Sequence, residues 1–135
     1  MVEEAERYRD SMGTYFLLES LDFLRKNGRL TGLQAFFATA LNIKPIMAGV
    51  GGVIVKLEQA RGMNKALARM AEIAVERAGD TSEKRLIIAH CNNLARAEQV
   101  RDLMCRNAAY RDIVITDTAG VATVYAGDGG IILTL

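Results

Sequence analysis

Hydrophobic positions recur every three or four residues in the middle of the chain, and this spacing predicts two amphipathic helices. The first covers residues 63–78, with apolar positions at Met63, Ala66, Leu67, Met70, Ile73 and Ala74. The second begins near Leu94, with apolar positions at Ala97, Val100, Leu103 and Met104. Each helix is expected to bury one apolar face against the rest of the protein.

Short apolar runs bounded by turn residues predict about six strands. They read "GTYFLLE", "IKPIMAG", "VIVKLEQA", "RLIIAHC", "DIVITD" and "GIILTL". The sequence "GVGG" between the second and third runs is typical of a hairpin. Because Pro45 has no N–H to donate, its strand is expected at a sheet edge or at a bulge.

Three further segments have helical patterns. Charged residues with Val2, Ala5 and Tyr8 spaced by three predict a connecting helix over residues 1–12. A short helix, "LDFLRKN", has Ser20 to cap it and Gly28 to end it, and "LQAFFATAL" predicts a buried helix. Residues 13–135 are therefore expected to form one α+β domain. Its mixed or antiparallel sheet has about six strands, with helices packed mainly on one face.

Composition narrows the class of protein. Seventeen basic and sixteen acidic residues give a formal net charge of +1, which provides no reason to expect a nucleic acid partner. No stretch approaches the roughly 18 apolar residues that span a bilayer, and the charged N-terminus is unlike a secretory signal. Cys91 and Cys105 are expected to be reduced thiols. A cytoplasmic protein is the expectation.

Enzymatic features are weak in this sequence. His90 and Cys91 are adjacent on a predicted strand, where neighbouring side chains point to opposite faces, so we expect His90 to be hydrogen-bonded and to close the strand. The glycine-rich "AGDGG" matches neither the Walker pattern nor the dinucleotide fingerprint, and is expected to turn into a last strand. We therefore expect no catalytic residue, no metal site and no cofactor.

Two basic features remain candidates for binding. In "KNGRLTG", Arg29 and Thr31 have the chemistry to hold a carboxylate or a phosphate, although a surface arginine and a helix cap are the simpler explanation from the sequence alone. Arg61, Lys65 and Arg69 follow an i, i+4, i+8 row. That row is either a solvated helix face or a docking surface for an acidic partner.

Four segments, in order, resemble the C-terminal domain of the DegV family of fatty-acid-binding proteins. They are "TYFLLESLDFLRKNGRLTG", "ALNIKPIM", "RLIIAHCNN" and the glycine-rich ending. The resemblance implies a two-domain protein that holds one long-chain fatty acid between its domains and presents the carboxylate to a separate fatty-acid kinase. It also implies that the N-terminal DegV domain, which supplies the rest of the site, is absent from this chain.

The resemblance also implies site residues. The family ending is usually H-x-G-P-G, whereas "YAGDG" puts Tyr125 at the histidine and Asp128 at the proline. Arg29, Tyr125 and Thr31 are then expected at the fatty-acid head; Tyr125 can donate a hydrogen bond but carries no positive charge, and Asp128, if close, would repel the carboxylate. The candidates for the acyl tail are Leu33, Phe36, Phe37, Ile46 and Met47, for each of which core packing is the alternative.

A second hypothesis is a protein-interaction or self-association module that has lost lipid binding. Without a partner domain, the apolar cleft face would be exposed, and such a patch tends to associate. A homodimer that buries this face is the form expected under that hypothesis.

Overall fold

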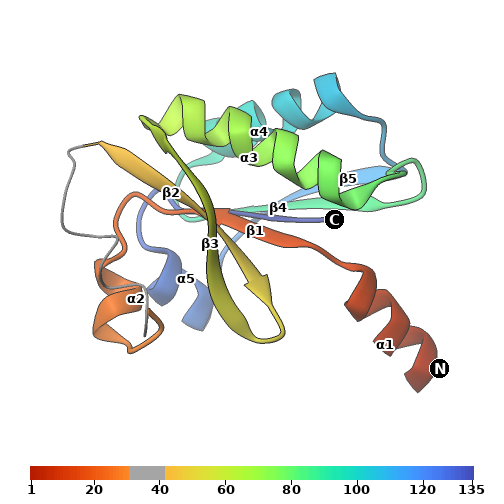
Figure 1. The fold of residues 1–135 in the computed structure, drawn as a ribbon, viewed down its shortest axis with the longest axis horizontal. Helices are drawn as coiled ribbons and strands as arrows, with labels where there is room; N and C mark the ends of the chain where they lie inside the picture. Colours follow the sequence, from red (N-terminus) through yellow and green to blue (C-terminus); the bar gives the residue numbers. More distant parts are fainter. Residues whose placement is uncertain (31–41) are drawn as a thin grey trace.

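A six-stranded sheet organises the computed structural model, which describes residues 1–30 and 42–135 (Figure 1). Its strands are β1 (Thr14–Leu17), β2 (Ile43–Val50), β3 (Val53–Arg61), β4 (Arg85–His90), β5 (Asp112–Asp117) and β6 (Ile131–Thr134). They lie in the order β3-β2-β1-β6-β4-β5. β4 and β5 run parallel and the other neighbours antiparallel, so the predicted mixed α+β sheet is confirmed.

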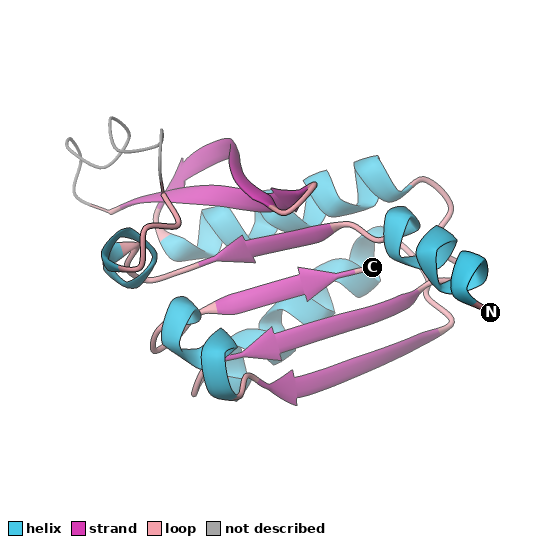
Figure 2. Cartoon of the chain, turned by 90° about the horizontal axis from the view of Figure 1, so that it is seen from below, coloured by secondary structure: helices cyan, strands magenta, loops and turns pink. Residues whose placement is uncertain are grey.

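Helices lie on both sides of the sheet, with the long ones together. They are α1 (Val2–Ser11), α2 (Asp22–Lys26), α3 (Met63–Ala78), α4 (Leu94–Asn107) and α5 (Gly120–Ala126). Figures 1 and 2 show α3 and α4 along one face, α2 and α5 at one end of the opposite face, and α1 at the other end. α1 buries none of its residues, and the predicted helix "LQAFFATAL" lies outside the described residues.

The main core lies between the sheet and the pair α3 and α4. Alternate strand residues point into it, for example Leu17 of β1, Ile88 of β4 and Leu133 of β6, all fully buried. The apolar face of α3 meets them through Leu67 and Met70. Period-two strands and a period-3.6 helix thus bury the faces that their patterns predict.

A smaller apolar cluster lies on the opposite face, under α2 and α5. Its buried members are Leu18, Leu24, Leu30, Met47, Cys91 and Ala126. Phe16 and Tyr125 pack against it while remaining partly exposed. Since these two short helices cover one end of the face, the described residues leave the strands beside them open (Figure 2).

The β2–β3 hairpin and the position of Pro45 agree with the predictions from the sequence. Gly51 and Gly52 have φ values of 57° and 80°, as a two-residue hairpin turn of the primed type requires. Pro45 pairs with Gln59 of β3, and the register shifts between Ile46 and Met47. Because β1 pairs with β2 at residues 47–49 only, Pro45 lies beyond that ladder, next to a bulge, as predicted.

Helix α5 was not predicted from the sequence. Three of its seven residues, Val121, Thr123 and Val124, are β-branched, a composition more typical of a strand. Gly127 ends the helix with a φ of +68°, and its N–H donates to the Thr123 carbonyl at 3.0 Å. This glycine C-cap is the signal that sequence reasoning could have used.

Candidate functional site

An apolar cavity of about 510 Å³ opens on the less covered face of the sheet, within the usual range for a small-molecule site. Its lining residues come from β1 and β6, from the β2–β3 hairpin, from α2 and the turns on either side of it, and from α5. They are Thr14, Phe16, Leu18, Leu24, Gly28, Arg29, Gly52, Val53, Ile54, Ala122, Tyr125, Ala126 and Ile132. Most of this surface is hydrocarbon, which suits an extended apolar ligand.

Sequence reasoning missed most of these apolar wall residues. Phe16 and Ile132 alternate with core residues on β1 and β6, and both are only partly buried because none of the described helices covers them. The signal was present in the strand period, since every second residue of a strand points away from the core. What the period alone does not reveal is which part of that second face is left open.

Arg29 and Tyr125 meet at this cavity. The guanidinium carbon of Arg29 lies 5.6 Å from the centre of the Tyr125 ring, within the range of a cation–π contact. Both side chains line the cavity. The pair offers a positive charge and a hydroxyl donor at the edge of an apolar surface.

The end of α2 fixes the backbone of Arg29. Gly28 has a φ of +68°, its N–H donates to the Arg25 carbonyl at 3.1 Å, and the N–H of Arg29 donates to the Leu24 carbonyl at 2.9 Å. This pair of bonds is the Schellman motif that ends helices at a glycine. The sequence "NGR" therefore places Arg29 at a defined point beside the cavity.

The glycines after α5 make room for close contacts. At Gly127 a Cβ would lie 3.0 Å from the Phe23 ring, and at Gly129 one would lie 3.0 Å from both the Arg96 guanidinium and the Glu19 side chain. The segment is tied to the end of β4, since the Gly129 N–H donates to the Cys91 carbonyl and the Cys91 N–H donates to the Gly130 carbonyl. The glycine-rich ending therefore turns into the last strand, as predicted.

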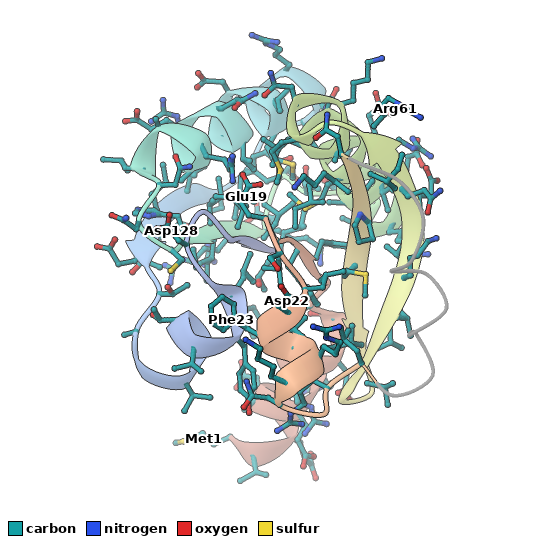
Figure 3. All side chains as sticks on the ribbon, turned by 90° about the vertical axis from the view of Figure 1, so that its left-hand side faces the viewer. Met1, Glu19, Asp22, Phe23, Arg61 and Asp128 are labelled. Atoms are coloured by element: carbon teal, nitrogen blue, oxygen red, sulfur yellow. The ribbon has the colours of Figure 1, made fainter. Side chains whose placement is uncertain are left out.

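Asp128 does not line the cavity. Its Oδ1 accepts a hydrogen bond from Asn92 Nδ2 at 2.8 Å, on the β4–α4 turn, and the residue is exposed. Figure 3 shows it at the edge of the molecule, well apart from Asp22 on α2. The Asp128 carboxylate is therefore bonded to the β4–α4 turn and is not among the residues that line the cavity with Arg29 and Tyr125.

The candidates for the acyl tail divide into three groups. Ile46 is fully buried in the main core, on the far face of the sheet from the cavity, so it is a core residue. Met47 is buried in the smaller cluster, next to residues that line the cavity. The remaining tail candidates, Leu33, Phe36 and Phe37, and the head-group candidate Thr31 lie outside the described residues.

The basic row does not form on one helix face. Arg61 ends β3, whereas α3 begins at Met63. Arg69 is held by carboxylates, with bonds of 2.8 Å to both Glu58 oxygens and to Glu72. The i, i+4, i+8 row required Arg61 to belong to the start of the helix, and Arg61 belongs to β3 instead.

His90 closes β4 as predicted. It is 6% exposed, its Nδ1 accepts from the Asn93 N–H at 3.2 Å, and its Nε2 lies 3.5 Å from Asp117 Oδ1. No group of three or more potential metal ligands occurs within residues 1–30 and 42–135. In the same part of the chain no helix is both long enough and apolar enough to cross a bilayer.

Comparison with known proteins gives consistent matches over the whole chain. The family model described as "Uncharacterised protein, DegV family" matches residues 1–134. A DegV domain-containing protein of Streptomyces coelicolor is 34% identical over 129 residues, which are 95% of this chain and 46% of that protein. The chain thus spans about half the length of the curated relatives that it matches.

Solved structures agree with these matches. A DegV family protein of Ruminococcus gnavus, refined with vaccenic acid, has a TM-score of 0.93 and 48% identity, covering 99% of this chain and 48% of that one. The fatty acid kinase B3 protein of Streptococcus pneumoniae, loaded with linoleic acid, has a TM-score of 0.81 and 29% identity, covering 98% and 47%. From its sequence and its fold together, the chain belongs to the DegV family.

Proposed function

We propose that this chain forms one wall of a binding site for a long-chain fatty acid, with the carboxylate of the acid at Arg29 and Tyr125. The observation that carries the proposal is the Arg29–Tyr125 contact at the edge of an apolar cavity. Two relatives solved with bound fatty acids support the ligand class. The other wall, in this proposal, comes from the N-terminal domain of a complete DegV protein.

The two parts of the ligand need different surfaces. Each methylene removed from water contributes about 0.8 kcal/mol, so the tail is held by apolar walls such as Phe16, Ile54 and Ile132. The head is a carboxylate, for which Arg29 supplies the charge and Tyr125 a hydroxyl donor. Thr31 remains a candidate at the head, and Leu33, Phe36, Phe37 and Met47 remain candidates along the tail.

The role we infer is that of a carrier and not of an enzyme. An acyl chain held in an apolar site leaves its carboxylate accessible to the active site of a separate fatty-acid kinase, and the name of the S. pneumoniae relative supports such a partner. Arg61 and Lys65 are exposed and remain candidates for docking. Arg69 fits that role less well, because carboxylates of its own chain surround it.

Native mass spectrometry of the purified protein tests the proposal. We expect added oleic acid to appear as a bound mass that is lost on denaturation. The fraction of protein that carries this mass should be smaller for the Arg29→Gln variant. The matched control is Arg25→Gln, because Arg25 is an exposed arginine of α2, four residues before Arg29, and is paired with Asp22. Failure of the chain to bind oleic acid at any concentration would show that this wall alone holds no lipid.

Self-association is a second candidate function. Four valines on the hairpin and on α5, which both line the cavity, are strongly exposed: Val50, Val53, Val121 and Val124. An exposed apolar surface of this kind favours a dimer that buries it. Sedimentation of the lipid-free protein tests this, since a dimer that Val53→Lys converts to a monomer would support self-association through this face.

A further inference from the structure

Arg96 joins two segments that are far apart in the sequence. It lies in the first turn of α4, and its side chain is 16% exposed. Its Nη1 donates to the Gly129 carbonyl and its Nη2 to Glu19 Oε1, both at 2.6 Å. Glu19 belongs to the turn between β1 and α2, and Gly129 to the turn between α5 and β6.

Those two turns lead to the two head-group residues. The first continues into α2, whose C-terminal turn fixes Arg29, and the second follows directly on α5, which carries Tyr125. α2 and α5 pack against each other, with Phe23 against the backbone of Gly127. Arg96 itself does not line the cavity, so it acts on Arg29 and Tyr125 only through the segments that it holds.

Lys44 also binds Glu19, in addition to Arg96. Lys44, at the start of β2, donates from Nζ to both the Glu19 carbonyl and Oε2 at 3.0 Å. Figure 3 shows Glu19 between α2, which bears the labelled Phe23, and the α4 side of the molecule. The carboxylate therefore anchors the β1–α2 turn to two cations from two different elements.

The contact depends on the shape of the arginine and on the glycine opposite. A planar guanidinium can donate to two acceptors at once in a fixed geometry, which a lysine ammonium on a flexible stem does not reproduce. Gly129 has a φ of +80°, and a Cβ there would crowd the Arg96 guanidinium. The glycine after Asp128 is thus required by this contact as well as by the turn.

We propose that Arg96 is a positioning residue that, through Glu19 and Gly129, holds Arg29 against Tyr125 and so sets the preference of the site for a carboxylate head group. The inference rests on the proposed function. It assigns no contact between Arg96 and the ligand. It adds a determinant of head-group selectivity that lies outside the cavity.

A measurement without ligand tests the positioning. In the wild-type chain, the Tyr125 ring should shift the Arg29 Hδ resonances upfield, and NOEs should connect the two side chains. Arg96→Gln is expected to remove both signals. The control Arg69→Gln also breaks a multidentate ion pair, but on α3, and should leave them unchanged. Persistence of the shift and the NOEs in Arg96→Gln would overturn the proposal.

A measurement with ligand tests the selectivity. We compare the Kd of oleic acid with that of oleyl alcohol, and expect Arg96→Gln to reduce the preference for the acid by about tenfold, the size of a lost charge-assisted contact. Arg96→Lys should not restore it. In the background Arg29→Gln, the further change Arg96→Gln should have no additional effect on the ratio. An unchanged ratio of the two Kd values in Arg96→Gln, or full rescue by Arg96→Lys, would overturn the role proposed for Arg96. Neither result would contradict the proposed function itself.

The ratio of the two Kd values in the wild type distinguishes a failure of the proposed function from a failure of the inference about Arg96. If the wild-type chain binds both ligands equally, the head-group role proposed for Arg29 and Tyr125 is wrong, and the selectivity assigned to Arg96 is wrong with it. If the wild type prefers the acid and Arg96→Gln retains that preference, the proposed function stands and the inference about Arg96 fails.

Discussion

The Arg29 guanidinium lies over the Tyr125 ring, 5.6 Å from its centre, and joins the end of α2 to α5. The family resemblance implies a histidine at the position of Tyr125, so this chain has a phenolic hydroxyl where the family usually has an imidazole. Among the described residues that line the cavity, Arg29 supplies the positive charge, and it lies against the Tyr125 ring. Charge and hydrogen-bond donor are thus divided between two side chains.

The first prediction concerns this pair. Arg29→Gln should weaken oleic acid binding by about tenfold, or about 1.4 kcal/mol, because a charge-assisted hydrogen bond is lost. Tyr125→Phe should cost less, about 1 kcal/mol, as expected for a neutral hydrogen bond. Isothermal titration with oleic acid measures both values. Oleyl alcohol should bind all three proteins alike, and equal losses for acid and alcohol would contradict a head-group role.

The second prediction concerns Gly127, where a positive φ and a close neighbour coincide. Gly127 has φ +68° and ψ 169°, a region that is essentially restricted to glycine and costs another residue about 1–3 kcal/mol. Gly127→Ala should destabilise the protein by more than this backbone cost, because the new Cβ also meets the Phe23 ring. Gly79→Ala is the control, since Gly79 also has a φ of +68°, with a ψ of −123°, and a Cβ there would meet no atom of the described residues within 4 Å.

Urea unfolding gives the free energies for this comparison. Adding Phe23→Ala to Gly127→Ala should recover the part of the loss that is due to the clash. Equal losses at Gly127 and Gly79 would show that the backbone alone, and not the α2–α5 contact, sets the cost.

The third prediction contrasts neighbouring residues of β6. Leu133 is fully buried in the main core, so Leu133→Ala should cost about 2–5 kcal/mol of unfolding free energy. Ile132 is half-buried and lines the cavity, so Ile132→Ala should cost less stability but weaken binding of oleic acid and oleyl alcohol equally. Thermal unfolding and titration together check both effects. A loss of binding restricted to the acid would place Ile132 at the head and not along the tail.

The fourth prediction concerns pH. Partial burial of Glu19 opposes its ionisation, but hydrogen bonds from Lys44 and Arg96 outweigh it and lower the pKa of the carboxyl below its ordinary value. A carboxylate with a lowered folded-state pKa stabilises the protein above its unfolded pKa of about 4.3, and this stabilisation is lost as pH falls through the folded value.

Urea unfolding from about pH 7 to about pH 3 checks this dependence. The difference between the wild type and Glu19→Gln should be constant near neutrality and shrink below about pH 4.3. Because Glu19 is partly exposed, salt should reduce the difference. Glu3→Gln, on α1, is the control, and a difference that grows on acidification would contradict the assignment.

Regular periodicity explains what could be predicted from the sequence. The apolar repeat predicted a helix from residue 63 to about residue 78, which agrees with α3, because a helix buries every third or fourth side chain. The "GVGG" hairpin and the bulge near Pro45 followed from the chemistry of glycine and proline. Helix α5 was missed because its β-branched residues favour a strand, whereas packing against α2 and the glycine cap at Gly127 favour a helix.

The sequence by itself determined the local conformations: the strand and helix periods, the glycine-ended α2 that fixes Arg29, and the family. The tertiary structure alone decided which residues share a site. It put Ile46 in the core and its neighbour Met47 on the opposite face, brought Arg29 to Tyr125, and tied Glu19 to Arg96. Local conformation depends on a few neighbouring residues, whereas these contacts depend on how the strands pair across the whole sheet.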